Sequence, residues 1–410
     1  MILKSKQRTQ SVVLLLSTAM NIFVGLAVNY YLTKILSKEE YGNYALMINI
    51  LEMGQVIVNF GFYQSICRLV AITEDVKKSR EYYFAGLIVT IVLYVILAIG
   101  LLFYINISTS IRENNMQGMM YLTIPFAWIF LLITYNELYL QGDNKIGLMA
   151  FGRLGPRVIY LSFLILAYSF IDAGQYAIVV LYMIPYIVVF TIIIYLIRLS
   201  KNNLRERLYE IWEANKSFGF NIYVGALVAT GSATLSGILI SHFEETNVSV
   251  GYFSIATRLC TPLSLLPNIL ATVYFKKMAS SRNISIRLQL SMLVLNALCF
   301  VGVYVISGPL ILIIFGDDYA PATPIIQVLA IGYLLYGMSD FYNRFLLSKG
   351  RGKELRNTSF IIGFVLVASN YFLVKSFGAM GAAYARIVSG FLYFVIIYFT
   401  YRVIVSKYVD

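Results

Sequence analysis

The chain alternates long apolar stretches with short polar segments, and most of the polar segments are basic. Runs without a charged residue include Thr9–Thr33, Tyr82–Ile111, Ala173–Ile197 and Leu288–Gly316. A helix needs about 20 mostly apolar residues to cross roughly 30 Å of hydrocarbon. The pattern predicts an all-α integral membrane protein with about twelve transmembrane helices, near residues 9–35, 41–68, 82–106, 118–141, 150–170, 174–198, 215–241, 248–275, 286–314, 321–347, 356–374 and 378–401.

The composition agrees with a membrane protein. Hydrophobic residues make up 59% of the chain and charged residues 13%, whereas about 25% of residues are charged in soluble domains. The first apolar run follows Lys4, Lys6 and Arg8, but it is too long for a signal peptide and lacks a small-residue cleavage site. We therefore expect a retained span. The cysteines and the single histidine lack metal-site spacing, so we expect no metal and no cofactor.

Lysine and arginine residues fall mostly on one side of the predicted topology. The loops and helix ends on the side of the N-terminus hold 24 of the 32, with Arg153 counted among them, the opposite side holds 4, and the interiors of the spans hold 4. Cytoplasmic loops carry an excess of basic residues, so we predict that both termini are cytoplasmic. The basic loops then face the anionic headgroups of the lipid bilayer. This distribution explains the net charge of +12 without a nucleic-acid partner.

The two halves of the chain resemble each other at a separation of about 208 residues. Gly42 and Gly251 open equivalent helices, and Gly142 and Gly350 follow a later pair of helices. Six helices per half predict a parallel repeat, with the substrate site between the halves. We predict an N-terminal six-helix lobe over residues 1–199, a basic cytoplasmic linker over 200–214 and a C-terminal six-helix lobe over 215–410.

Eight ionisable residues lie inside predicted spans, where each costs roughly 2.5–3.5 kcal/mol on insertion scales. Such residues persist when they face a partner or a water-filled cavity. They are Glu52, Glu137, Arg153, Arg157, Arg258, Asp340, Arg344 and Arg386. Five arginines against three acids predict a cationic interior. Guanidinium groups bind phosphate oxygens bidentately, so this interior suits a diphosphate or an acidic sugar.

These residues fall into two groups of candidates. The candidates for binding the substrate are Arg157, Arg258, Arg344 and Arg386. The candidate lumen or coupling acids are Glu52, Glu137 and Asp340. Simpler interpretations stay open, because Asp340 and Arg344 are four residues apart and can form an internal salt bridge. Arg153 can reach the headgroups by snorkelling, and Glu52 can neutralise an arginine or carry a coupling proton.

Four segments carry a family resemblance. They are Leu36–Gly42 (LSKEEYG), Ile314–Tyr319 (IFGDDY), Leu347–Lys353 (LSKGRGK) and Phe377–Ala385 (FGAMGAAYA). In this order they resemble polysaccharide biosynthesis transporters, the Wzx-type O-antigen flippases of the multidrug/oligosaccharidyl-lipid/polysaccharide (MOP) exporter superfamily. The resemblance covers nearly the whole chain. Its motifs are helix-end signatures, which identify the fold and superfamily better than the substrate.

The resemblance implies two six-helix lobes of the MATE or MOP type and a location in a bacterial inner membrane. It implies a flippase, and not an enzyme, that moves an undecaprenyl-diphosphate-linked oligosaccharide by alternating access. This cargo is the O-antigen repeat unit of lipopolysaccharide, and it passes from the cytoplasmic to the periplasmic leaflet. The O-antigen polymerase and the chain-length machinery are implied as partners. Coupling to H+ or Na+ stays open.

Two other functions are alternatives. A MATE-like multidrug antiporter has the same fold but binds organic cations and often uses an acid in its first helix, and Thr9–Thr33 contains none. An O-antigen polymerase typically has a large periplasmic loop, whereas the outer loops predicted here are short. No paired carboxylates or nucleotide-binding loop indicate enzyme chemistry.

Overall fold

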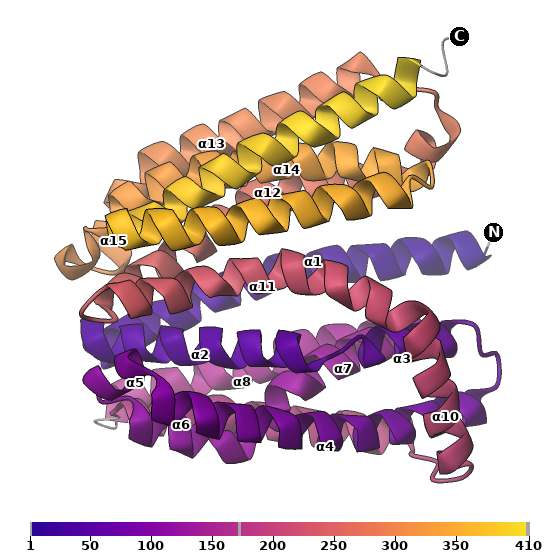
Figure 1. The fold of residues 1–410 in the computed structure, drawn as a ribbon, viewed down its shortest axis with the longest axis horizontal. Coiled ribbons are helices and arrows are strands. Elements are labelled where there is room, and N and C mark those ends of the chain that lie inside the picture. Colours follow the sequence, from indigo (N-terminus) through magenta and orange to yellow (C-terminus); the bar gives the residue numbers. More distant parts are fainter. Residues whose placement is uncertain (1, 171–173, 407–410) are drawn as a thin grey trace. The chain divides into compact units, whose positions relative to one another are not determined.

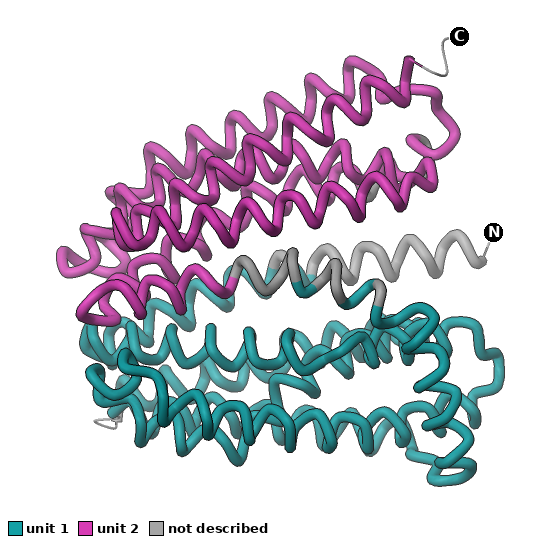
Figure 2. Tube along the Cα trace, in the orientation of Figure 1, with its two compact units in different colours: residues 1–227 teal, residues 228–410 magenta. Residues whose placement is uncertain are grey.

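The computed structural model describes residues 2–170 and 174–406, and these residues form helices without any strand. The side chains of Lys4, Lys6, Arg8, Lys276 and Lys277, and the whole of Lys407, lie outside the described part, so their predicted positions stay predictions. The chain divides into two compact units, 1–227 and 228–410 (Figure 2). This boundary lies inside a helix, and the predicted linker belongs to unit 1 by its contacts.

Unit 1 is a helical bundle in which α8 packs on α1 and α9, and α7 packs on α3, α4 and α8 (Figure 1). Its short helix α10 lies across the ends of α3 and α4. The elements of this unit are α1 (Ile2–Ile35), α2 (Lys38–Val58), α3 (Phe62–Ala71), α4 (Val76–Ile107), α5 (Thr109–Glu113), α6 (Gln117–Thr123), η1 (Ile124–Phe126), α7 (Trp128–Gly142), α8 (Ile146–Phe170), α9 (Gln175–Ile197), α10 (Leu204–Ala214), the π-helix η2 (Asn215–Gly219) and the first part of α11 (Phe220–Phe243).

Unit 2 is a bundle of long helices in which α14 packs against α12, α13 and α15. Its elements after α11 are α12 (Val248–Ser280), α13 (Ile286–Ile314), η3 (Asp317–Tyr319), α14 (Ala322–Ser348) and α15 (Gly352–Ser406). Each of the twelve predicted ranges falls on helix. By length and composition, six described helices can cross a membrane, or up to eight if each bent pair is one span. The all-α membrane fold is therefore confirmed, while the count of twelve spans stays a prediction.

The second predicted span, 41–68, is two helices joined at a bend of 65°. Helix α2 begins with a capping box, in which the Ser37 hydroxyl accepts from the Glu40 N–H at 3.3 Å and the Glu40 carboxylate accepts from the Ser37 N–H at 3.0 Å. It ends before Phe60 and Gly61, which both have positive φ. Only glycine fits at Gly61, because a Cβ there would lie 2.3 Å from the backbone oxygen of Gly219.

The sequence repeat has a structural counterpart at the ends of α7 and α14. Lys145 N–H donates to the Leu140 carbonyl at 2.9 Å, and Arg351 N–H donates to the Leu346 carbonyl at 3.1 Å. Both are the six-to-one bond of a Schellman motif, with a left-handed residue before the donor. That residue is Asn144 in one half and Gly350 in the other. The equivalent positions are thus 206 apart, and Gly350 matches Asn144 rather than Gly142.

Helix α15 contains the two last predicted helices, joined by a break at Gly378 with φ 55° and ψ −136°. The carboxylate of Glu244, the residue after α11, accepts a hydrogen bond at 2.7 Å from the Ala379 N–H, which begins the second half. A Cβ at Gly381 would lie 2.0 Å from the Leu373 carbonyl oxygen. The small residues of Phe377–Ala385 therefore allow the chain to break and pack closely at this end of unit 2.

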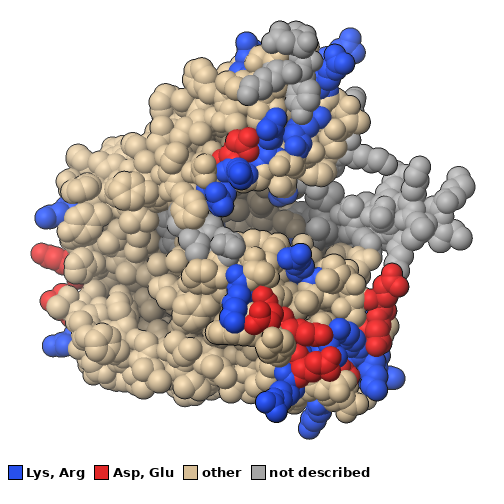
Figure 3. Space-filling view, turned by 45° about the vertical axis from the view of Figure 1, so that its right-hand side comes forward, with Lys and Arg blue, Asp and Glu red and all other residues tan. Residues whose placement is uncertain are grey.

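Within each unit, a lysine joins two segments that are far apart in the sequence. In unit 1, Lys78 of α4 pairs with Glu210 of α10 at 3.1 Å. In unit 2, the Lys349 ammonium donates to the carbonyls of Ala279 and Ser281 at 2.9 and 2.6 Å. Blue and red side chains mix on the visible part of unit 1, and blue side chains predominate on that of unit 2 (Figure 3). Loops predicted to be cytoplasmic thus share an end within each unit.

Candidate functional site

The predicted site residues form two groups, one in each unit. In unit 2, α14 and α15 bring together five side chains that we call the Arg386 cluster. On α14, Tyr333, Tyr336 and Asp340 follow a spacing of three and four residues, which places them on one helix face. On α15, Arg386 and Tyr393 are seven residues apart and so share a face.

Arg386 packs on aromatic rings, and the Asp340 carboxylate lies within its electrostatic reach. Its guanidinium carbon lies 4.0 Å from the ring centre of Tyr336 and 4.9 Å from that of Tyr333. The Nε atom is buried and has no hydrogen-bond partner. Within the described residues, Arg386 forms no ion pair. Cation–π contacts leave the full positive charge in place, so this guanidinium keeps hydrogen-bonding capacity for a ligand.

Asp340 and Arg344 do not form the salt bridge that their spacing allowed. The Asp340 carboxylate accepts from the Tyr393 hydroxyl at 3.1 Å, and Arg344 Nε donates to the Asn268 side chain at 3.2 Å. These partners come from α15 and α12, which pack on either side of α14. Tertiary partners thus replace the local pair.

Arg258 lies on α12, next to the same cluster. The Tyr333 hydroxyl is within hydrogen-bond reach of Thr257 and Thr261, which precede and follow Arg258 on that helix. The Arg258 Nε is buried without a partner, and the residue forms no ion pair with any carboxylate that the structure describes. Unit 2 therefore holds three intramembrane arginines, Arg258, Arg344 and Arg386, without a described carboxylate within ion-pair distance. One acid, Asp340, lies within electrostatic reach of Arg344 and Arg386.

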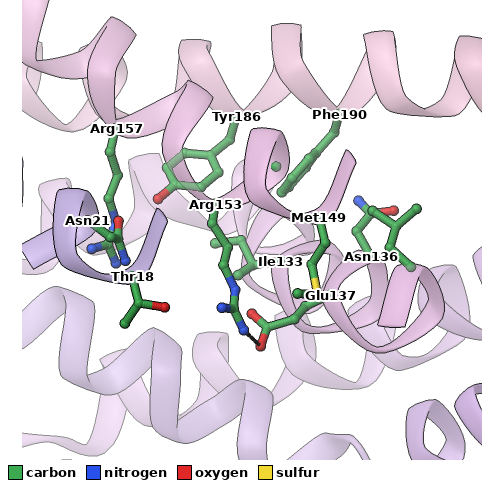
Figure 4. Close-up of a pocket in the computed structure, with 12 residues that line it drawn as sticks. Thr18, Asn21, Ile133, Asn136, Glu137, Met149, Arg153, Arg157, Tyr186 and Phe190 are labelled. Carbon is green, nitrogen blue, oxygen red and sulfur yellow. Dashed lines mark hydrogen bonds and ion pairs between the residues drawn. The ribbon is translucent and has the colours of Figure 1, made fainter. Parts of the chain in front are cut away.

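The second group lines a cavity of about 260 Å³ inside unit 1, which we call the unit 1 cavity. The ion pair between Arg153 and Glu137 forms part of its wall, and Arg157 extends toward Asn21 (Figure 4). Arg153 thus pairs with a protein carboxylate, whereas the sequence had suggested that it reaches the lipid headgroups by snorkelling. The lining comes from α1, α7, α8 and α9 and comprises Thr18, Asn21, Ile133, Asn136, Glu137, Leu140, Met149, Gly152, Arg153, Arg157, Tyr186 and Phe190.

Glu52 stands apart from the cavity wall. Its side chain is exposed on α2 and lies within electrostatic reach of Arg157. Arg157 is also within reach of the Tyr186 hydroxyl. Of the three candidate acids, Glu137 is therefore tied to an arginine, Asp340 to a tyrosine, and Glu52 is the exposed one.

Sequence reasoning missed the neutral residues of both groups. Tyr333, Tyr336 and Tyr393 were not among the candidates, and neither were Asn21 and Asn136. The spacing of Tyr333 and Tyr336 before Asp340 was a usable signal, because it places two rings on the face of a predicted site acid. The asparagines gave no such signal.

The comparisons with known proteins agree with this architecture. The chain is similar to a structure titled lipid II flippase MurJ in an inward closed conformation, with a TM-score of 0.73, 14% identity, and coverage of 95% of this chain and 87% of that one. It is also similar to a ligand complex of the MATE multidrug transporter DinF-BH, with a TM-score of 0.68, 14% identity and coverage of 96% and 94%. An inward-facing MATE transporter of the MOP superfamily has a TM-score of 0.67, with 12% identity and coverage of 96% and 98%.

At these identities the structural matches establish the fold, which flippases and drug transporters share. A comparison with curated proteins yields no match. The family described as polysaccharide biosynthesis protein matches residues 9–280, which is more than half of the chain. The chain has the fold of the MOP transporters and belongs to the polysaccharide biosynthesis protein family.

Proposed function

We propose that this protein is a flippase for an anionic, lipid-linked oligosaccharide. The cargo is an undecaprenyl-diphosphate-linked O-antigen repeat unit, which passes from the cytoplasmic to the periplasmic leaflet of a bacterial inner membrane. The lobes alternate in access, and the lipid tail stays in the bilayer. The family supports a role in polysaccharide synthesis, and the fold supports transport.

The observation that carries the proposal is the excess of positive charge among the candidate residues of unit 2, where three arginines face one acid, Asp340. An arginine inside a membrane is costly, and it is usually paired or faces a water-filled path. Arg258 and Arg386 form no ion pair within the part of the chain that the structure describes, and Arg344 binds an amide. A diphosphate supplies the missing negative charge and accepts bidentate hydrogen bonds from guanidinium groups.

The membrane potential favours the proposed direction. Moving one elementary charge across the membrane is worth about 2.3 kcal/mol per 100 mV. Since the cell interior is negative, each phosphate charge gains free energy on the way out. The proposal includes coupling of transport to H+ or Na+, with the exposed Glu52 as the group that would bind the ion.

The test is charge reversal in a bacterial strain in which this gene is deleted and returned on a plasmid. We expect Arg386→Glu and Arg258→Glu to reduce long O-chain display at least tenfold while the protein stays in the membrane. The matched control is Arg356→Glu, which reverses an exposed arginine at the start of α15 and should retain display. Full display by both site variants would overturn the proposal.

The drug-transporter alternative rests on the same fold and makes an opposite prediction. A site for organic cations would be improved, or left unaffected, by removing positive charge from the Arg386 cluster. Uptake and efflux of a cationic dye by cells carrying Arg386→Gln distinguish the two functions. Dye efflux by the wild-type protein together with normal O-chains in the deletion strain would favour the antiporter.

A further inference from the structure

The unit 1 cavity contains buried polar atoms that no protein group satisfies. Asn136 is 2% exposed, and its side-chain oxygen accepts from the Tyr83 hydroxyl at 2.6 Å, while its amide nitrogen has no partner. If the amide is rotated, the oxygen is left free instead, so one atom stays unsatisfied in either orientation. The Asn21 side-chain oxygen is also buried without a partner. An unmade buried hydrogen bond costs about 1–3 kcal/mol, so turning either amide toward a polar occupant of the cavity would gain free energy.

The charges around the cavity largely cancel. The cationic Arg153 and the anionic Glu137 form an ion pair in its wall. Arg157, the remaining cation, lies within electrostatic reach of Glu52. A diphosphate would therefore gain little here compared with the Arg386 cluster, and the cavity suits an uncharged polar ligand.

The remaining wall is aromatic and apolar. The rings of Tyr186 and Phe190 lie 5.7 Å apart, with Ile133 and Met149 also in the lining (Figure 4). Pockets for drug-sized ligands have about 300–1,000 Å³, so a volume of about 260 Å³ fits a single ring better than an oligosaccharide. A pyranose has apolar C–H faces that pack on aromatic rings. Its hydroxyls donate and accept hydrogen bonds, as the free amide atoms require.

We propose that the unit 1 cavity binds one neutral pyranose residue. In the context of the proposed function, on which the identity of the cargo rests, this residue belongs to the transported glycan. The cavity then recognises a sugar ring, while the Arg386 cluster recognises negative charge.

The test is saturation-transfer NMR on the full-length protein in lipid nanodiscs. The probes are methyl glucoside, methyl rhamnoside, methyl N-acetylglucosaminide and methyl glucuronide. We expect at least one neutral probe to bind, the glucuronide to bind less well, and Asn21→Leu and Asn136→Leu each to weaken binding up to tenfold, the factor for about 1.4 kcal/mol. The control is Asn106→Leu, at the exposed end of α4, which should bind as the wild type does.

Water alone would also satisfy the free amides. Equal signals from all probes, unchanged by Asn21→Leu, would mean that water fills the cavity and would overturn the sugar site. The Asn21 variant keeps the test decisive if Asn136→Leu unfolds the protein by freeing the Tyr83 hydroxyl.

The sugar site and the proposed flippase function can be overturned independently of each other. If a neutral sugar binds while the Arg386 and Arg258 charge-reversal variants keep full O-chain display, the sugar site is supported and the anionic flippase is overturned. If those variants lose display and no sugar binds, the flippase is supported and the sugar site is overturned.

Discussion

The two units treat their arginines differently. In unit 1, Arg153 pairs with Glu137, and the buried Arg207 pairs with Glu81 at 3.1 Å and also with Glu210. In unit 2, no intramembrane arginine that the structure describes has a carboxylate partner within ion-pair distance, and Arg386 packs on two tyrosine rings instead. The contrast separates charges that hold a bundle together from charges kept available for a ligand.

This difference predicts which property each arginine controls. A buried ion pair that loses one partner leaves an uncompensated charge, which destabilises the fold. An arginine without an acid partner leaves no such charge behind. We therefore expect variants of unit 1 pairs to lower stability, and variants of unit 2 arginines to lower transport at unchanged stability.

The largest effect is expected for Arg207→Ala in unit 1. Arg207 is 5% exposed, and its removal leaves the buried Glu81 without a cation. We expect a loss of about 3–5 kcal/mol of stability, measured as a lower melting temperature of the purified protein. The control is Arg205→Ala, since Arg205 is exposed on the same helix. Equal melting temperatures for the two variants would contradict a structural role for the Arg207 pairs.

Arg386→Gln in unit 2 is expected to act on transport alone. Hydrogen bonds to charged groups are worth about 1.5–3 kcal/mol, so the initial rate with a fluorescent lipid-diphosphate saccharide should fall roughly tenfold to a hundredfold in proteoliposomes. The melting temperature should change little, because Arg386 has no carboxylate within ion-pair distance among the described residues. A clear drop in melting temperature would show that Arg386 stabilises the fold as Arg207 does, and the two units would then not differ in the role of their arginines.

Tyr336→Leu should have a smaller effect on the same reaction. The Tyr336 ring lies 4.0 Å from the guanidinium carbon of Arg386, and a cation–π contact is worth about 0.5–2 kcal/mol. We expect a twofold to thirtyfold lower transport rate, with most activity retained in Tyr336→Phe. If the phenylalanine variant were as slow as the leucine variant, the hydroxyl that donates to Ser389 at 3.1 Å would be the important group.

The Arg153–Glu137 pair should show a smaller effect, because its side chains are 29% and 37% exposed. A double-mutant cycle of Arg153→Gln and Glu137→Gln should return a coupling energy of about 1 kcal/mol or less in thermal unfolding. A zero coupling energy would show that the pair does not stabilise unit 1.

The smallest effect is a pH dependence from α10, which lies outside the spans. Partial burial opposes the charge of Glu210, but hydrogen bonds from Tyr82, Arg207 and Lys78 outweigh it and lower the pKa of this carboxyl. A lowered pKa in the folded state stabilises the protein above the ordinary carboxylate pKa, about 4.3, and the gain is lost as pH falls through the folded pKa. The difference in melting temperature between wild type and Glu210→Gln should be constant near neutral pH and shrink below pH about 4.

The helices of this fold could be predicted from the sequence because apolar length alone identifies them. The breaks inside them could not. The bend at Phe60 and Gly61 depends on η2, more than 150 residues later in the chain, whose Gly219 backbone approaches Gly61. The break at Gly378 is capped by Glu244, which follows the end of α11. Hydropathy along one segment carries no information about such partners.

The candidate site could be predicted in its charged residues but not in their pairing. Spacing on one helix suggested Asp340 with Arg344, yet each found a partner on a neighbouring helix. The unit 1 cavity could not be predicted for a similar reason, since Asn21 and Asn136 line one cavity only after α1 and α7 each pack on α8. Single charges in apolar runs are visible in a sequence, whereas neutral ligands of a cavity are not.

The ring contacts of Arg386 have a consequence for selectivity. A guanidinium whose flat side rests on tyrosine rings presents its N–H bonds from its edge, in one plane. A ligand must then offer two oxygens side by side in that plane, as a phosphate does. A lysine at this position would supply the same charge, but its ammonium group would not direct two N–H bonds in one plane. Arg386→Lys should therefore preserve attraction for anions in general while losing the preference for those with a forked pair of oxygens.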